Sequence, residues 1–322
     1  MNFQLDISIP DLEPRIVHPS NVLLIGSCFT EHMTNFLNRA KVRTMQNPHG
    51  IIFNPLSVCR ALQDIVENKI YSEDDLFFLN EYWHSWFHHS DFSDMSKEKA
   101  LEKINTSILT HHTFLKETDY LFITLGSSFA YKLLEKDLFV SNNHRAPSQW
   151  FEKTLLDIDL MRTSLENVMD KIRTINPSMR FVFTVSPVRH SRDGVIENNR
   201  SKARLLEVVH SLKNIYYFPA YELVIDVLRD YRFYDLDMVH PNYQATAFVW
   251  EKFVTHCMDP HCIPLMKQMD QIFKAKNHLS RNSESEAHKK FQFEHYELCK
   301  GLKEEFPYLD LEEEMTIFRS SH

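Results

Sequence analysis

The sequence predicts an α/β protein with a doubly wound, flavodoxin-like parallel sheet, because strand and helix patterns alternate along the first 258 residues. Two short apolar runs, 21–25 and 121–125, each end at a glycine and have the length and content of buried parallel strands. Residues 180–186 and 215–219 predict two more strands, each closed by a proline that cannot continue a ladder. Helical patterns lie between these strands, from residue 30 onward and at 55–67, 97–115, 154–175 and 198–212.

The sheet type also predicts where chemistry takes place and where the first domain ends. In doubly wound sheets the active residues lie on loops at the carboxyl ends of the strands. After about residue 259 the strand signals stop, and residues 259–264, which contain two prolines, interrupt the helix that begins near Pro241. We therefore expect a catalytic domain over residues 1–258 and a helical C-terminal extension over 259–322, with an exposed linker or a helix entry at 280–286.

Composition and charge exclude several classes of function. The net charge of −8 gives no general attraction for nucleic acid or for an anionic membrane surface, so neither is expected as a partner. The polar, acidic start of the chain lacks the pattern of an export signal, which predicts a cytoplasmic protein. The five cysteines are an odd, scattered set, which favours reduced thiols over a disulfide framework.

The first candidate for chemistry is the turn that follows the first strand. Gly26, Ser27 and Cys28 come directly after the apolar run and directly before a predicted helix. A side chain presented at a helix N-terminus meets free backbone N–H groups, which favour an anion, and we expect such a place to lower the pKa of a thiol. A cysteine after an apolar strand is more often a small buried core residue, so this segment alone does not establish a nucleophile.

The second candidate is a late acidic and histidine pair. Asp237 and His240 are three residues apart, a spacing that lets the carboxylate accept the Nδ1 proton and direct Nε2 toward a nucleophile. Pro241 then begins a helix that would hold the histidine at a rigid entrance. Unrelated acidic and histidine residues at this spacing are common on surfaces. The pair therefore indicates a catalytic site only in combination with the first segment.

Together these segments resemble the first and last motifs of SGNH/GDSL hydrolases, and the nearer resemblance is to the GSCFA family. Residues 26–30 read GSCFT, with threonine where the family has alanine, and residues 237–241 read DMVHP. Further matching segments follow in order: NPHGIIFNP (47–55), TLGSS (124–128), TVSPVRH (184–190), SKA (201–203), YFPAYE (217–222) and RDYRFY (229–234). The resemblance covers roughly residues 20–255, and several motifs in one order make chance similarity improbable.

The resemblance implies a role for each matching residue. Gly50 and Gly126 take the places of glycines that belong to the oxyanion hole in SGNH enzymes, and Ser128 stands where an asparagine usually donates a hydrogen bond. Aligning the glycines places Cys28 at the nucleophile position. Ser27 remains the alternative, because one residue of slippage in the turn would present its hydroxyl instead.

Three residues outside these motif roles are candidates for substrate binding. Arg189 and His190 follow a predicted strand and so face the active edge, where an arginine can hold a carboxylate, a phosphate or a sugar hydroxyl; a structural ion pair is equally compatible. His144 lies in a second possible substrate loop. The histidine-rich segment 83–91 favours packing over metal binding, because its spacing is not that of a zinc site.

These expectations combine into a hydrolase that forms an acyl-enzyme through a Cys or Ser, His and Asp triad, with no metal and no other cofactor. The resemblance suggests O-acyl esters, of O-acetyl type and including esters on carbohydrate, as substrates. Two alternatives stay open: an acyltransferase that uses an activated acyl donor, and a non-catalytic binding module on the same fold. The sequence also leaves open whether the C-terminal helices cover the site or form a homo-oligomer contact.

Overall fold

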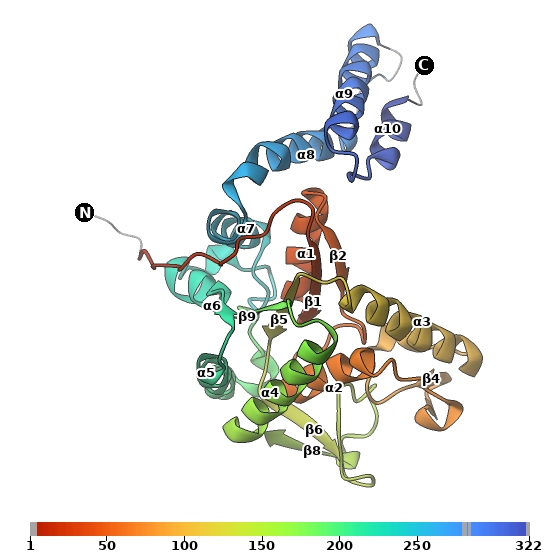
Figure 1. The fold of residues 1–322 in the computed structure, drawn as a ribbon. Coiled ribbons are helices and arrows are strands. Elements are labelled where there is room, and N and C mark those ends of the chain that lie inside the picture. Colours follow the sequence, from red (N-terminus) through yellow and green to blue (C-terminus); the bar gives the residue numbers. More distant parts are fainter. Residues whose placement is uncertain (1–4, 279–281, 283–284, 320–322) are drawn as a thin grey trace.

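The computed structural model describes residues 5–278, 282 and 285–319, and its centre is a five-stranded parallel sheet (Figure 1). The strand order is β10-β9-β5-β1-β2, and every neighbouring pair is parallel. The bounds are β1 (Asn21–Gly26), β2 (Arg43–Gln46), β5 (Tyr120–Leu125), β9 (Arg180–Val185) and β10 (Tyr216–Tyr217). The predicted fold class is confirmed. The edge strand β2, which is polar and mostly half-buried, lacks the apolar run that identifies the others.

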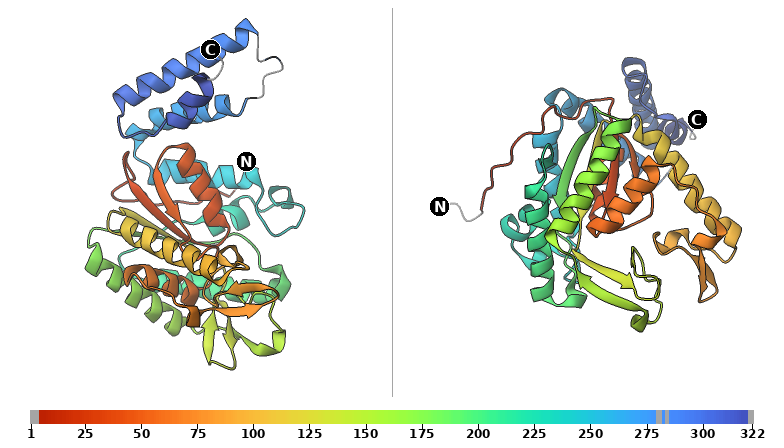
Figure 2. Two further views of the ribbon diagram at one scale, coloured as in Figure 1. Left: turned by 90° about the vertical axis from the view of Figure 1, so that its right-hand side faces the viewer. Right: turned by 60° about the horizontal axis from the view of Figure 1, so that its bottom comes forward.

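Helices cover both faces of this sheet, which is why the central strands are apolar throughout. In β1, Leu23 and Ile25 point to one face, and Val22 and Leu24 point to the other. Figure 2 shows the two layers of helices. The first face carries α2 (Pro55–Val66), α4 (Ile158–Ile175) and α5 (Val195–Ser211), with the end of α3 (Lys97–Leu115); the second carries α1 (Phe29–Arg39) and α7 (Tyr243–Cys257).

Local capping explains where several of these helices begin. The side chain of Asn54 accepts a hydrogen bond from the backbone of Ser57, with Pro55 at the first helical position, as the sequence predicts. The prediction of a helix from residue 154 is wrong at its start. Asp157 caps α4, and the residues before it belong to a strand.

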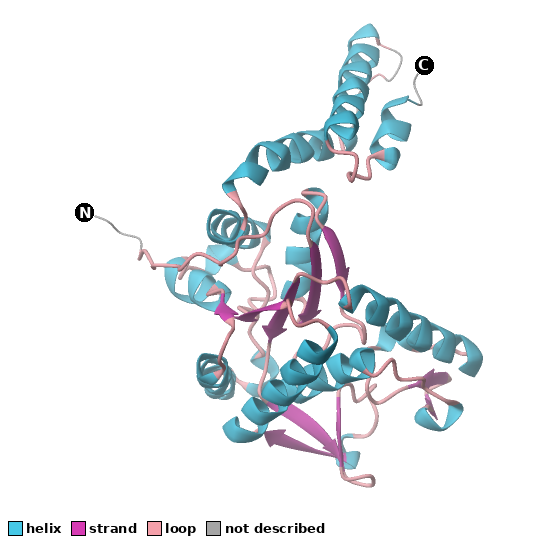
Figure 3. Cartoon of the chain, viewed as in Figure 1, coloured by secondary structure: helices cyan, strands magenta, loops and turns pink. Residues whose placement is uncertain are grey.

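Two small antiparallel sheets were not predicted from the sequence (Figure 3). One has the order β7-β6-β8, with β6 (Phe129–Leu133), β7 (Leu138–Val140) and β8 (Phe151–Leu155). The other is a hairpin of β3 (Phe77–Leu79) and β4 (Tyr82–His84). Their strands are short and of mixed burial, so they lack a clear apolar period. Both sheets lie near the carboxyl ends of the central strands.

The C-terminal extension is helical, as predicted, and has an apolar cluster of its own. It consists of α8 (Ile263–Lys276), α9 (Glu286–Glu305) and α10 (Glu312–Arg319). Lys41, after the end of α1, pairs with Glu314 of α10 at 2.8 Å and joins the extension to the first domain. Most of the linker or helix entry expected at 280–286 lies outside the described residues, and α9 begins at its end with Ser285 as the N-cap.

A short helix, α6 (Ala220–Glu222), continues into a π-helical turn at Leu223–Val227. Within the described part of the chain, no helix combines the length and apolar content that crossing a bilayer requires.

Candidate functional site

The turn after β1 is built on a glycine that no other residue can replace without strain. Gly26 has φ +144°, and a Cβ there would lie 2.1 Å from the backbone oxygen of Thr124 on β5. The side chain of Asn47 accepts a hydrogen bond from the Gly26 amide at 2.9 Å. The chain then turns directly into α1, with Cys28 as its N-cap residue.

Ser27 and Cys28 differ in how far their side chains reach solvent. Ser27 is 2% exposed, and its Oγ is buried without a hydrogen-bond partner among the described residues. Cys28 is half-buried and has a free thiol. Both residues line the same cavity, and Ser27 is the one whose side-chain oxygen is buried.

The environment of Cys28 corrects one expectation. Burial raises the pKa of the Cys28 thiol, and the carboxylate of Glu31 in the first turn of α1 raises it further. The backbone amides of Cys28 and Phe29 and the charge of Lys202 act in the opposite direction but are weaker. The expectation that the helix N-terminus lowers this pKa is therefore wrong, because loss of hydration outweighs the helix. A thiol in this state needs a base.

A tight turn holds the candidate base. Oδ2 of Asp237 lies 2.6 Å from Nδ1 of His240, and Oδ1 of Asp237 accepts the backbone N–H groups of Val239 at 2.8 Å and His240 at 3.0 Å. These hydrogen bonds lower the pKa of Asp237 to about 2. Because Nδ1–H donates a hydrogen bond to the carboxylate, Nε2 is the ring nitrogen left to act as an acceptor.

The two segments meet at one cavity of about 570 Å³ at the carboxyl ends of the central strands. Ser27 and Cys28 contribute to its wall from the turn after β1, and Asp237 and His240 contribute from the turn before α7. The pair is open to solvent, with 40% of the His240 side chain and 49% of the Asp237 side chain exposed. The topology thus brings together groups that are about 200 residues apart in sequence.

The three residues expected at an oxyanion hole have their hydrogen-bond donors engaged elsewhere. The Gly50 amide donates to Asn47 at 2.8 Å, and the Gly126 amide donates to Phe53 at 2.8 Å. The amide and hydroxyl of Ser128 both bond to Ser201, at 2.7 and 3.1 Å. The cavity-lining residues of the described structure include none of the three. The backbone amides of Cys28 and Phe29 act on the thiol instead, where they favour negative charge.

Two family models match this chain. The GSCFA family model matches residues 21–253, which contain both segments, and the model of the GSCFA domain protein, C-terminal domain, matches residues 269–321. The chain belongs to the GSCFA family. Among curated proteins, none matches this GSCFA protein in sequence.

Several solved structures share a likeness with this GSCFA protein. A carbohydrate esterase family 3 protein from Talaromyces cellulolyticus is 11% identical, with 77% of this chain and 98% of that chain covered and a TM-score of 0.35. A Clostridium thermocellum family 3 carbohydrate esterase is 11% identical, with 79% and 100% covered and a TM-score of 0.33. The acetyl xylan esterase Est2A from Butyrivibrio proteoclasticus is 9% identical, with 73% and 62% covered and a TM-score of 0.35. At this identity the likeness says nothing of the substrate of this chain.

Of the residues expected to bind substrate, two line the cavity and one does not. Arg189 and His190 lie on its wall. The guanidinium of Arg189 lies over the ring of Tyr234, 4.2 Å from its centroid. His144 is buried outside the cavity, where its Nε2 contacts the backbone oxygen of Ser85 at 2.8 Å, and burial lowers its pKa to about 4. The cavity is instead lined by the preceding Asn142 and its neighbour Asn143.

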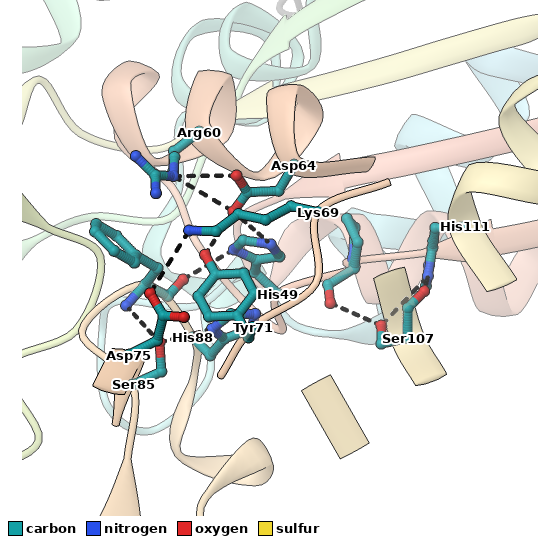
Figure 4. A network of polar contacts seen from close by, with 12 residues as sticks. His49, Arg60, Asp64, Lys69, Tyr71, Asp75, Ser85, His88, Ser107 and His111 are labelled. Carbon is teal, nitrogen blue, oxygen red and sulfur yellow. Dashed lines mark hydrogen bonds and ion pairs between the residues drawn. The ribbon is translucent and has the colours of Figure 1, made fainter. Parts of the chain in front are cut away.

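A buried polar network supports the GSCFA loop 47–55 from behind (Figure 4). Asp64 of α2 accepts a hydrogen bond from the hydroxyl of Tyr71 at 2.6 Å and pairs with Arg60 at 3.2 Å. His49 lies 3.5 Å from the same carboxylate and stacks on His88 with ring centroids 3.9 Å apart. Nδ1 of His49 lies 3.1 Å from the backbone oxygen of Phe87, and Nδ1 of His88 lies 2.9 Å from the hydroxyl of Ser85.

Sequence reasoning assigned no role to Lys202, although the SKA motif contains it. The side chain is 1% exposed, and its Nζ donates to the backbone oxygens of Gly126 and Ser186, both at 2.6 Å. A fully buried lysine is rare in folded proteins, and this one lies behind the cavity. A lysine on the inward face of a predicted helix was the signal available in the sequence.

Proposed function

We propose that this GSCFA protein is an acyl-ester hydrolase in which Cys28 is the nucleophile, His240 the general base and Asp237 the residue that orients it. The observation that carries the proposal is the wall of one cavity, which holds the thiol at the start of α1 and the hydrogen-bonded Asp237–His240 pair. A nucleophile, a base and a group that orients the base are the parts that acyl transfer requires.

The proposed reaction has two steps. In the first, Nε2 of His240 takes the proton of the Cys28 thiol while Sγ attacks the acyl carbonyl, and the departing alcohol oxygen receives that proton. The acyl group is then held as a thioester. In the second step, His240 takes a proton from water, the oxygen of that water attacks the thioester, and the carboxylic acid leaves as Cys28 recovers its proton. The amides of Cys28 and Phe29 would stabilise the oxyanion in both steps.

The choice of Cys28 over Ser27 rests on access. The Ser27 hydroxyl is buried and lacks a hydrogen-bond partner among the described residues, so no base is in place to activate it. Cys28 is less completely buried than Ser27, and the raised pKa of its thiol makes assistance by His240 necessary.

The exposure of the base favours hydrolysis over acyl transfer. An acyltransferase has to keep water away from the acyl-enzyme, whereas His240 is 40% exposed at the side chain and water can reach it freely. The cavity offers apolar side chains from Ile51, Phe53 and Phe129 and polar groups from Asn142 and Arg189. A short acyl group on a polar, hydroxyl-rich alcohol such as a sugar suits such a mixed wall.

The test is turnover of p-nitrophenyl acetate and of a panel of acetylated sugars by the whole chain, beside the His240→Ala and Cys28→Ala variants. We expect ester cleavage that either substitution lowers by at least about a hundredfold. A parallel reaction with acetyl-CoA and free sugars separates the two activities, because an acyltransferase produces acetylated sugar and free CoA. Equal cleavage by all three proteins would remove the proposal.

A further inference from the structure

A second cavity adjoins the one that holds the proposed triad, which is called the triad cavity below. The second cavity has a volume of about 410 Å³, within the range of about 300–1,000 Å³ that is usual for small-molecule sites. Arg189 and Ser191, from the loop after β9, belong to the walls of both cavities. The other lining residues of the second cavity come from 195–199 at the start of α5 and from 221–234. The proposed reaction assigns no role to these two segments.

The second cavity lies on the side of the triad cavity that carries the base. The backbone N–H of Arg189 donates to the backbone oxygen of Val239 at 3.2 Å, beside His240. Tyr234, which lines the second cavity, forms a β-bridge with Pro241 on the other side of the same histidine. In the proposed reaction His240 returns a proton to the departing alcohol oxygen, so the alcohol has to lie beside this turn. The second cavity is therefore the space into which a large alcohol would extend.

Tyrosine rings form part of the wall of the second cavity. The ring centroids of Tyr231 and Tyr234 are 6.1 Å apart, and the guanidinium of Arg189 lies 5.3 Å from the first and 4.2 Å from the second. These rings hold Arg189, and no carboxylate in the described part of the chain pairs with it, so its N–H groups are available to a ligand. Tyr231 is 65% exposed. Its ring offers an apolar face, against which the C–H groups of a sugar ring can pack.

The same wall carries hydrogen-bond donors and acceptors. Asn198 is 5% exposed and is fixed in place, because its Oδ1 accepts the backbone N–H of His190 at 2.9 Å. Asp226 supplies acceptors and Arg229 supplies donors, and neither forms an ion pair with another described residue. Since charges of both signs face the cavity, neither an anion nor a cation is strongly favoured. A hydroxyl group can donate to the carboxylate and accept from the guanidinium, so the wall suits a neutral ligand rich in hydroxyl groups.

We propose that the second cavity binds the alcohol part of the ester substrate, and that this alcohol is a neutral saccharide of at least two sugar units. The unit that carries the acyl group occupies the triad cavity beside His240. The next unit occupies the second cavity, with Tyr231 against its ring and Arg189 between the two units. The inference rests on the proposed function, because the alcohol that leaves in that reaction is the ligand of the second cavity. The second cavity takes no part in the chemical step and acts on the choice of substrate.

The experiment compares kcat/KM for monoacetylated glucose, xylose and N-acetylglucosamine with kcat/KM for the monoacetylated β-linked disaccharide of each sugar. A monoacetylated disaccharide of glucuronic acid and glucose is the anionic counterpart. The readout is the ratio of the disaccharide value to the monosaccharide value within one protein, which cancels any general loss of activity. The unmodified protein is compared with Tyr231→Ala, with Tyr231→Phe, which keeps the ring, and with Tyr243→Ala. Tyr243 of α7 is the matched control, because it is 64% exposed and is not among the described residues that line either cavity.

We expect the unmodified protein to prefer at least one neutral disaccharide over its monosaccharide by about tenfold. The ratio should fall to about one in Tyr231→Ala and persist in Tyr231→Phe and Tyr243→Ala. The absence of any preference for a disaccharide, a preference that Tyr231→Ala retains in full, or a preference for the anionic disaccharide alone would overturn the inference.

Calorimetric titration with the free disaccharides separates this inference from the proposed function, because binding needs no catalysis. We expect the unmodified protein to bind at least one of them, and Tyr231→Ala to bind it at least about fivefold more weakly. Such binding in a protein that cleaves no ester supports the saccharide site and removes the hydrolase. Cleavage of monosaccharide acetates without any effect of Tyr231→Ala on binding or on the ratio does the reverse.

Discussion

Nδ1 of His240 lies 2.6 Å from Oδ2 of Asp237, while the other oxygen of that carboxylate accepts the backbone N–H of the same histidine at 3.0 Å. One side chain therefore fixes both the tautomer of the imidazole and the turn that carries it. Both oxygens of Asp237 act within residues 237–240, so this turn holds the imidazole without a residue from elsewhere in the chain. This compactness makes Asp237 the most informative position for a first substitution.

We expect Asp237→Asn to lower kcat for ester cleavage by about a hundredfold to ten-thousandfold, because an amide can donate to Nδ1 and stabilise the wrong tautomer. Steady-state kinetics with p-nitrophenyl acetate measure the effect. Asp235→Asn is the control, since its position is two residues earlier and the backbone N–H, rather than the carboxylate, contacts His240. Activity within threefold of the unmodified protein for both variants would contradict the role of Asp237.

The charge of Asp237 also makes a prediction about pH. Its pKa is lowered to about 2, so the hydrogen-bonded carboxylate is present at all pH values well above 2 and is lost only as the pH falls through that value. The unmodified protein should therefore show no loss of activity from this group between pH 4 and pH 8. A plot of kcat/KM against pH for the unmodified protein and for Asp237→Asn tests the prediction: an acid limb between pH 4 and pH 8 that disappears in Asp237→Asn would contradict it.

The two candidate nucleophiles can be separated by labelling. A chromogenic acetate should acylate the unmodified protein and Ser27→Ala to the same extent, whereas Cys28→Ala should remain unlabelled. Removing the Ser27 hydroxyl should leave stability unchanged or slightly raised, because that buried oxygen makes no hydrogen bond with the described residues. Intact-protein mass spectrometry during turnover gives the result, and a label that follows Ser27 would reverse the assignment.

The central sheet and the two site segments could be predicted because their signals are local. The apolar runs of β1 and β5 end at glycines, and the acidic and histidine pair lies within four residues. The family resemblance then predicted that residues 26–30 and 237–241 form one site, which no local pattern in the sequence indicates. The short strands β6 and β8 were missed because each has only five residues and a mixed pattern of burial.

The predictions about site residues that the structure does not support depended mostly on contacts between residues far apart in sequence. The pKa of Cys28 is decided by how completely the rest of the chain covers the turn after β1. The Gly50 amide is the exception, because it donates to Asn47 within its own loop. The burial of His144 depends on the hairpin of β3 and β4, which the sequence did not reveal. The two hydrogen bonds of Lys202 form only when β5 and β9 are paired, because its acceptors Gly126 and Ser186 follow these strands.

Gly26 should be among the least replaceable residues in the chain. Gly26→Ala combines an unfavourable φ of +144° with a Cβ only 2.1 Å from the Thr124 oxygen, so we expect it to lower the free energy of unfolding by about 3 kcal/mol or more. Gly301→Ala is the matched control, because it lies inside α9 with open space around its Cβ and should raise stability by up to about 1 kcal/mol. Urea unfolding measures both, and equal effects would contradict the account of the turn.

The network behind loop 47–55 predicts that one distant hydroxyl stabilises the fold. Tyr71 donates its hydroxyl to Asp64 at 2.6 Å, and the Asp64 side chain is 3% exposed. Tyr71→Phe removes the donor and leaves a buried carboxylate with fewer partners, so the free energy of unfolding should fall by about 1–3 kcal/mol. Tyr82→Phe serves as the control, because its side chain lies at the surface and should change stability by less than about 0.5 kcal/mol. Urea unfolding of the two variants tests whether the Tyr71 hydroxyl contributes to stability, since the sequence of loop 47–55 is the same in both. A Tyr71→Phe protein as stable as its control would show that Arg60 suffices to hold Asp64.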